Sequence, residues 1–185
     1  MAVAPINIDY DLGEHGWSRF VLTVGDRNVE VGAFSYCTDA LGDLLRAALT
    51  IASGGYRAET SFDGEPVEWR LILQRDWRAI TPNTFDIKIV SFADIYARQP
   101  EAEGHLEFEA QVDGDAFARA IAHAAQTIWD QHGSDGYNRL WGGSEGFPLR
   151  ALGALQRALE LCDPRPATPD PSDFVFEVII TANDS

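Results

Sequence analysis

The chain has 185 residues, of which 45% are apolar, and carries a formal net charge of −15 at pH 7. This length suits one well-buried core, so we expect a single domain over residues 1–185. The excess of acid, without clusters of Lys and Arg, argues against nucleic acid and membrane surfaces as partners. No stretch approaches the ~18 consecutive apolar residues of a membrane helix, and residues 1–16 lack the pattern of a secretion signal. The 2 cysteines predict no disulfide framework and favour a cytoplasmic protein.

The charge is distributed unevenly along the chain. Residues 1–100 contain 14 acidic and 9 basic side chains (−5), whereas residues 101–185 contain 15 and 5 (−10). One interpretation is that the charge only keeps the protein in solution. The other is that it attracts a basic partner, because long-range fields speed the association of opposite charges.

The first part of the chain predicts a strand, a hairpin and a helix. Residues 5–12 alternate apolar and polar side chains, as a strand with one buried face does. Residues 17–24 and 29–35 are β-rich runs joined by a short polar turn, which is typical of a hairpin. Leucines and alanines at helical spacing follow Thr38 or Asp39, either of which can cap a helix, and a pair of glycines ends it.

Four further strands are expected over residues 56–63, 67–75, 85–92 and 105–112. In the run 67–75, large apolar side chains alternate with a mostly polar set, which predicts an antiparallel strand with one buried face. Its inward set is Val67, Trp69, Leu71 and Leu73, and its outward set is Glu68, Arg70, Ile72 and Gln74.

The last third of the chain predicts two helices, a loop between them and a final strand. Asp113 or Asp115 opens the first of these helices, and a glycine-rich loop over residues 133–146 follows it. Pro148 suits the first turn of the next helix. Prolines make residues 163–173 irregular, and the apolar run at 174–181 predicts a strand inside the sheet. The chain as a whole predicts an α+β fold, with a largely antiparallel or mixed sheet of about eight strands and three helices.

The run Phe-Asp-Gly-Glu-Pro-Val-Glu-Trp-Arg-Leu at residues 62–71 has the pattern F-D-x-E-P-x-x-W-R-L, and Phe-Asp-Ile-Lys-Ile-Val-Ser-Phe follows at 85–92. In these residues the chain resembles a widespread group of uncharacterised bacterial proteins, over about residues 17–130. That group has no established activity, so the resemblance implies a bacterial origin and assigns no functional residue. Physically, Pro66 fixes the backbone at a turn and Trp69 supplies a large core-facing ring.

Residues 142–146 contain Gly-x-Ser-x-Gly, the spacing that places a serine nucleophile on a strand-to-helix turn in α/β-hydrolases. Such a serine needs a buried strand before it and an acid and a histidine after it. The histidines all precede Ser144: they are His15, His105, His123 and His132. A different chain order is physically possible, because triads are defined by geometry. We interpret Ser144 as part of a loop before a helix and expect no catalytic residue.

Two groups of side chains have the donor atoms of a divalent metal site. They are His105, Glu107 and Glu109 on one strand face, and Asp130, His132 and Asp135 near a helix end. Alternating polar residues are equally typical of a solvent-facing strand, and a histidine is favourable near a helix C-terminus. We therefore expect neither a metal site nor a cofactor.

Candidate binding residues lie in the segment 129–147, where large side chains are interleaved with glycines. They are Trp129, His132, Tyr137, Arg139, Trp141 and Phe147. Long loops often carry function, and Trp, Tyr and Arg dominate binding hot spots. The alternative is that these aromatic side chains pack the loop onto the core.

The sequence favours a protein that binds over one that catalyses, because no trio of reactive side chains is visible. The first hypothesis is a non-enzymatic, acidic domain that binds a basic protein, for example a toxin whose activity it blocks. The alternative is a small-molecule-binding or hydrolytic protein that uses the 129–147 loop as a pocket wall. A third hypothesis is a self-associating structural protein.

Overall fold

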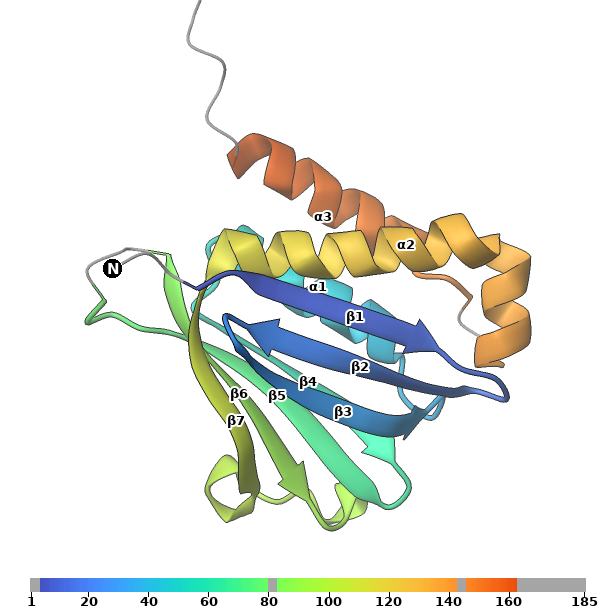
Figure 1. Ribbon diagram of the computed structural model, residues 1–185, viewed down its shortest axis with the longest axis horizontal. Coiled ribbons are helices and arrows are strands. Elements are labelled where there is room, and N and C mark those ends of the chain that lie inside the picture. Colours follow the sequence, from blue (N-terminus) through green and yellow to red (C-terminus); the bar gives the residue numbers. More distant parts are fainter. Residues whose placement is uncertain (1–3, 80–82, 143–145, 163–185) are drawn as a thin grey trace, which may run out of the picture.

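Two antiparallel sheets and three α-helices make up the structure, which is an α+β fold (Figure 1). The computed structural model describes residues 4–79, 83–142 and 146–162. The three-stranded sheet has the order β1 (Ile6–Leu12), β2 (Trp17–Val24), β3 (Arg27–Ser35). The four-stranded sheet has the order β4 (Arg57–Gly64), β5 (Val67–Arg75), β6 (Thr84–Phe92), β7 (His105–Asp113). The helices are α1 (Ala40–Ala52), α2 (Gly114–Trp141) and α3 (Leu149–Cys162), and the short 3-10 helices η1 (Ile95–Ala97) and η2 (Glu101–Glu103) precede β7.

The strand predictions agree with this architecture. The bounds of β2 and β5 are those predicted, and the other strands begin and end within about two residues of the prediction. The expected final strand at 174–181 and the proline-rich segment 163–173 lie outside the described residues. No helix within the described ranges is long and apolar enough to cross a bilayer.

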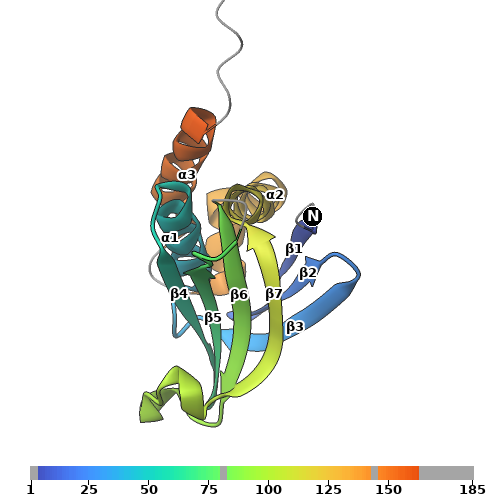
Figure 2. The same cartoon turned by 90° about the vertical axis from the view of Figure 1, so that its left-hand side faces the viewer.

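The two sheets lie at an angle to each other, and α1 and α2 cover the side toward which both sheets turn (Figure 2). Helix α1 contacts β4, and α2 contacts β1 and β7. Helix α3 packs on α1 and α2 as an outer layer (Figure 1). One cluster of buried side chains includes residues from both sheets and from all three helices. Both sheets therefore share a continuous core.

Aromatic rings at the centre of this core join the two sheets. Phe20 of β2 and Phe34 of β3 both contact Phe62 of β4, with ring centroids 5.2 and 5.0 Å apart. Trp141, at the end of α2, lies 6.4 Å from Phe34. Burying each such side chain stabilises the fold by about 1.5–3 kcal/mol. These contacts fix the end of α2 against β3.

Helix α2 differs from the prediction, because much of the segment expected to be a loop is helical. The chain bends at Gly133 and continues as helix to Trp141 (Figure 1). Gly133 has φ 58° and ψ −168°, a conformation that is essentially restricted to glycine. Gly142, in the left-handed region, ends the helix. Glycine content favours a loop, but Gly136, Tyr137 and Trp141 are buried, and this burial outweighs the low helix propensity of glycine.

Strand β5 is buried on both faces at its centre, whereas its alternation predicted one solvent-facing side. Ile72, on the predicted outward side, is 1% exposed and forms a small second cluster with Val90 and Phe92. Gly104, just after η2, lies so close to Val90 and Phe92 that a Cβ atom would not fit there. The connection between β6 and β7 therefore folds back over this part of the sheet and covers it.

The two predicted helix starts behave differently. Asp113 caps α2, because its carboxylate accepts a hydrogen bond from Ala116 N at 2.9 Å. Asp39 precedes α1 as predicted, but its side chain accepts no hydrogen bond from the helix backbone. It accepts one from the Arg46 guanidinium at 2.8 Å instead. The Asp39 carboxylate therefore forms an ion pair with a side chain about two helical turns further on, in place of a cap.

Candidate functional site

The structure tests the metal candidates from the sequence but not the catalytic one. Ser144 lies outside the described residues. Of the three polar residues along β7, Glu107 accepts a hydrogen bond from Ser91 at 2.6 Å, and Glu109 lies 3.8 Å from Lys88 Nζ. Within residues 4–79, 83–142 and 146–162, no group of three or more His, Cys, Asp or Glu side chains is arranged to hold a metal ion.

The aromatic members of the candidate binding set pack against one another and against the core. Tyr137 and Trp141 are 1% and 2% exposed. The ring of Phe147 lies 5.0 Å from that of Trp129 and 5.3 Å from that of Tyr137. These contacts agree with the alternative interpretation, in which the aromatic side chains pack the segment onto the core. The grooves described below are not lined by Trp129, Tyr137 or Trp141.

The polar members of the set lie nearer to solvent. His132 is half-buried and Arg139 is exposed. Phe147 also lines a groove of about 750 Å³ between α1 and the start of α3, together with Arg46. The guanidinium of Arg46 is held by Asp39 at 2.8 Å, so its charge is already neutralised. Among the described residues of the segment 129–147, no aromatic side chain is exposed, and the exposed side chains are polar.

Most of the charged side chains on the outer face of the four-stranded sheet form ion pairs within the protein. The side chain of Glu68 is 3% exposed, and its carboxylate lies 2.9 Å from the guanidinium of Arg70, whose side chain is 11% exposed. Ser61 donates a hydrogen bond to the same carboxylate at 2.6 Å. The Arg70 guanidinium also lies over the ring of Phe92, 4.3 Å from its centroid. A buried carboxylate needs such an ion pair and hydrogen bond, because burying an unpaired charge is strongly unfavourable.

A second set of ion pairs ties this sheet to the connection that covers it. Arg57 and Lys88 both contact Glu101 of η2, at 3.2 and 3.1 Å. Burial alone would raise the pKa of Glu101, but the hydrogen bonds from Lys88 and Arg57 outweigh it and hold the pKa below its usual value.

The outer face of the three-stranded sheet presents more acid than base to solvent. Its outward side chains form what we call the open face: Asn7, Asp9, Asp11, Trp17, Arg19, Val21, Thr23, Asn28 and Glu30. The helices lie on the other side of this sheet (Figure 2). Arg19 contacts Asp11 at 3.1 Å and Glu30 at 3.6 Å. Asp9, opposite Val21 in the register, forms no ion pair with any described residue.

Trp17 is a partly exposed aromatic residue beside these charges. Its exposed fraction is 38%, and it lines a groove of about 340 Å³ with the side chains of Asp11, Arg19 and Glu30. The backbone next to it is held firmly, because Gly16 N donates a hydrogen bond to the carbonyl of Leu140 at 2.8 Å. A tryptophan on a rigid support, next to charged groups, has the composition of a binding hot spot.

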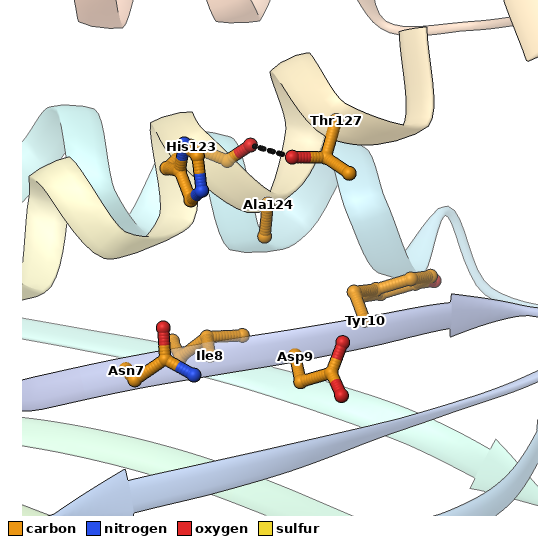
Figure 3. Close-up of a pocket in the computed structure, with 7 residues that line it drawn as sticks. All are labelled: Asn7, Ile8, Asp9, Tyr10, His123, Ala124 and Thr127. Carbon is orange, nitrogen blue, oxygen red and sulfur yellow. Dashed lines mark hydrogen bonds between the residues drawn. The ribbon is translucent and has the colours of Figure 1, made fainter. Parts of the chain in front are cut away.

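A second groove runs along the edge of the open face, between β1 and α2 (Figure 3). Its volume is about 250 Å³. The lining residues are Asn7, Ile8, Asp9 and Tyr10 of β1, with His123, Ala124 and Thr127 of α2. His123 and Thr127 are one helical turn apart, and the Thr127 hydroxyl donates to the carbonyl of His123 at 3.0 Å. Asp9 therefore belongs both to this groove and to the open face.

Hydroxyl groups beneath the open face are buried without partners. The side-chain oxygens of Tyr10, Ser18 and Tyr137 have no hydrogen-bond partner among the described residues. Burial, and then the charge of Tyr137, raise the pKa of Tyr10 well above its usual value. Burial, and then the charge of Asp39, raise the pKa of Tyr137. Both tyrosines therefore stay protonated at neutral pH and supply no base.

Comparisons with protein-family models, with curated proteins and with solved structures find no match. The resemblance carried by residues 62–71 stays a prediction. In the structure this run forms the hairpin of β4 and β5, with Glu65 and Pro66 in the turn. The buried carboxylate of Asp63 accepts a hydrogen bond from Glu65 N at 3.0 Å. Phe62 and Trp69 pack against the core, so the run has a structural role.

The open face was not among the candidates taken from the sequence, although the alternation within one strand indicates part of it. Alternation places Asp9 and Asp11 on the same side of one strand. Nothing in that pattern says whether solvent or a helix lies on that side. The positions of Trp17 and Arg19 beside these carboxylates follow from the pairing of β1 with β2.

Proposed function

We propose that this protein is a binding domain that recognises a basic protein through the open face. The observation that supports the proposal best is the charge imbalance there, where the single guanidinium of Arg19 lies among the carboxylates of Asp9, Asp11 and Glu30. A basic surface gains from such a field in association rate and in specificity. On the outer face of the four-stranded sheet, most carboxylates contact Arg57, Arg70 or Lys88, whereas Asp9 on the open face forms no ion pair with a described residue.

Trp17 adds an apolar anchor to the charged surface. Its ring is partly exposed within the groove of about 340 Å³, next to Arg19. Hot spots of protein interfaces are enriched in Trp and Arg, and truncating one costs about 2 kcal/mol of binding free energy or more. Trp17→Ala is therefore expected to weaken the complex in addition to any effect of charge.

Charge-neutral variants of the open face test the proposal. The open-face variant combines Asp9→Asn, Asp11→Asn and Glu30→Gln. The matched control removes the same charge at exposed acidic residues elsewhere, with Glu103→Gln, Asp135→Asn and Glu160→Gln. Wild type and both variants are immobilised and exposed to extract of the source organism at several salt concentrations. The retained proteins are then identified and quantified by mass spectrometry.

The expected result is a basic protein that wild type and control retain at low salt and release at high salt. The open-face variant should retain about 10-fold less of it, since the lost charges act together on affinity. Equal retention by the two variants at every salt concentration refutes the proposal. So does the recovery of wild-type protein without any bound partner.

A further inference from the structure

The groove of about 250 Å³ between β1 and α2 has an apolar base and a polar rim (Figure 3). Ile8, Tyr10 and Ala124 are only 3%, 8% and 7% exposed, so they form its base. Polar side chains line the rim on both sides: Asn7 and Asp9 from β1, and His123 and Thr127 from α2. This composition suits a side chain that is apolar along its stem and polar at its end.

The rim offers hydrogen-bond acceptors and one negative charge without a partner. The side chains of Asn7 and Asp9 form no hydrogen bond or ion pair within the described part of the chain. A carboxylate only accepts hydrogen bonds, and the carboxamide of Asn7 adds a further acceptor oxygen. The Thr127 hydroxyl donates its proton to the carbonyl of His123 at 3.0 Å, so the lone pairs of its oxygen are left to accept. Acceptors therefore face the groove from both β1 and α2.

The absence of a cation distinguishes this groove from the other two described above. The groove between α1 and α3 contains Arg46, which is held by Asp39. The groove beside Trp17 contains Arg19, which contacts Asp11. No Lys or Arg is among the residues that line the groove between β1 and α2. A cation that enters it meets an acid without meeting a like charge, and like charges at close range repel.

We propose that an arginine side chain of the basic partner occupies this groove. Its aliphatic stem lies along Ile8 and Ala124, and its guanidinium donates to the carboxylate of Asp9 and to the oxygen of Thr127. Arginine and lysine side chains place their stems on apolar surface in this way, while the charged end stays near solvent. The inference rests on the proposed function, because it names the side chain of the partner that is bound and extends the interface from the open face to α2.

The choice of arginine over lysine follows from the arrangement of the acceptors. A guanidinium carries five N–H donors in one plane, so it can bond an acceptor on each side of the groove at once. The ammonium of lysine is a compact charge at the end of a flexible stem. It can pair with Asp9, but it gives up the contact with Thr127 across the groove. An arginine should therefore bind more tightly than a lysine by about one hydrogen bond.

Titration of the full ¹⁵N-labelled chain with small arginine derivatives, followed by NMR, tests this inference. The probe is N-acetyl-arginine methylamide, which should shift the amide signals of residues 8–10 and 123–127 until the groove is saturated. N-acetyl-citrulline methylamide has the same shape without the charge and should bind about 5-fold more weakly, since it forms no ion pair. N-acetyl-lysine methylamide should bind about 2- to 5-fold more weakly, since it loses one hydrogen bond.

Single variants separate the contribution of charge from that of the second acceptor. Asp9→Asn should weaken binding of the arginine probe about 5-fold, as the loss of an ion pair does. Thr127→Val removes the acceptor on α2, so the preference for the arginine probe over the lysine probe should disappear. Glu103→Gln removes an acidic charge at an exposed site on η2 and should leave both affinities unchanged. The spectra of the free variants show whether each of them is folded.

The proposal is overturned if the citrulline derivative binds as tightly as the arginine probe, or if Asp9→Asn binds that probe as tightly as wild type does. It is also overturned if wild type does not prefer arginine to lysine, or if Thr127→Val keeps the preference, because the groove then holds a charge and not a guanidinium. Each of these results leaves the retention of a basic partner by the open face untouched. Conversely, arginine binding in the groove without any retained partner refutes the proposed function alone.

Discussion

Replacing Tyr137 by Phe should stabilise the protein, because it removes a buried hydroxyl that has no partner. Tyr137 is 1% exposed, and its oxygen makes no hydrogen bond with a described residue. A polar group buried in this way costs about 1–3 kcal/mol. The ring contacts to Trp141 at 6.4 Å and to Phe147 at 5.3 Å do not involve the hydroxyl. We expect the free energy of unfolding to rise by about 1 kcal/mol, which for a chain of this size is about 2–4 °C in Tm.

Urea titration and thermal unfolding at pH 7 measure the change. Tyr137→Ala is the matched variant, because it also removes the ring, and it should lower the free energy of unfolding by about 3–5 kcal/mol. If Tyr137→Phe is instead less stable than wild type by about 0.5 kcal/mol or more, the hydroxyl is hydrogen-bonded in solution, for example to a trapped water. The reasoning from an unpartnered oxygen would then be wrong.

The same substitution predicts a pH dependence with a definite sign. Burial and the charge of Asp39 raise the pKa of Tyr137 in the folded protein above the ordinary tyrosine value of 10.0. The folded state then holds its proton to higher pH than the unfolded state does. The free energy of unfolding of wild type therefore does not change through this group below pH 10, and it falls as the pH rises from 10 toward the folded pKa. The advantage of Tyr137→Phe over wild type should therefore grow as the pH rises above 10, and a constant advantage would contradict this assignment.

Three further substitutions test other parts of the structure. Arg70→Met leaves the carboxylate of Glu68, 3% exposed, without its cation, and should lower the free energy of unfolding in urea by about 3–5 kcal/mol. Adding Glu68→Gln should restore part of that loss, and no recovery would contradict a charge effect. Gly133→Ala places alanine at φ 58° and ψ −168° and should cost about 1–3 kcal/mol. Gly142→Ala, at φ 73° and ψ −3°, should cost about 1–2 kcal/mol, so a lower Tm for Gly142→Ala than for Gly133→Ala would refute the comparison. Glu101→Gln should destabilise the protein above the usual glutamate pKa of 4.5, and the difference should disappear as the pH falls through the lowered pKa of Glu101. A difference that persists in urea titrations at pH 2 would show that it does not come from the ion pairs.

The secondary structure follows largely from local patterns in the chain. The bounds of β2 and β5 agree with the predicted runs of β-prone residues, because such runs are bounded by turn residues that end a strand. The predicted loop after Gly133 was wrong, because glycine content favours a loop but the chain is helical as far as Trp141. Helix propensities differ by about 1 kcal/mol per residue or less. Burying an aromatic side chain such as Tyr137 or Trp141 gains about 1.5–3 kcal/mol, so packing decides the conformation there.

The candidate site depends on contacts between segments that are distant in the sequence. Trp17 and Arg19 lie beside Asp11 because β1 pairs with β2 in one particular register. In the same way, Ile72 is buried on a side that its strand pattern assigns to solvent, because the connection between β6 and β7 folds back over it.

Alternation by itself determined which side chains of each strand share a face, since successive residues in a strand point to opposite sides. It could not determine what covers a face. That was decided by the packing of α1 and α2 on one side of the sheets (Figure 2), which leaves Asp9 and Asp11 in solvent on the other. Hydrophobic burial has no direction of its own, so the placement of helices over sheets follows from the whole set of apolar surfaces and not from any one segment.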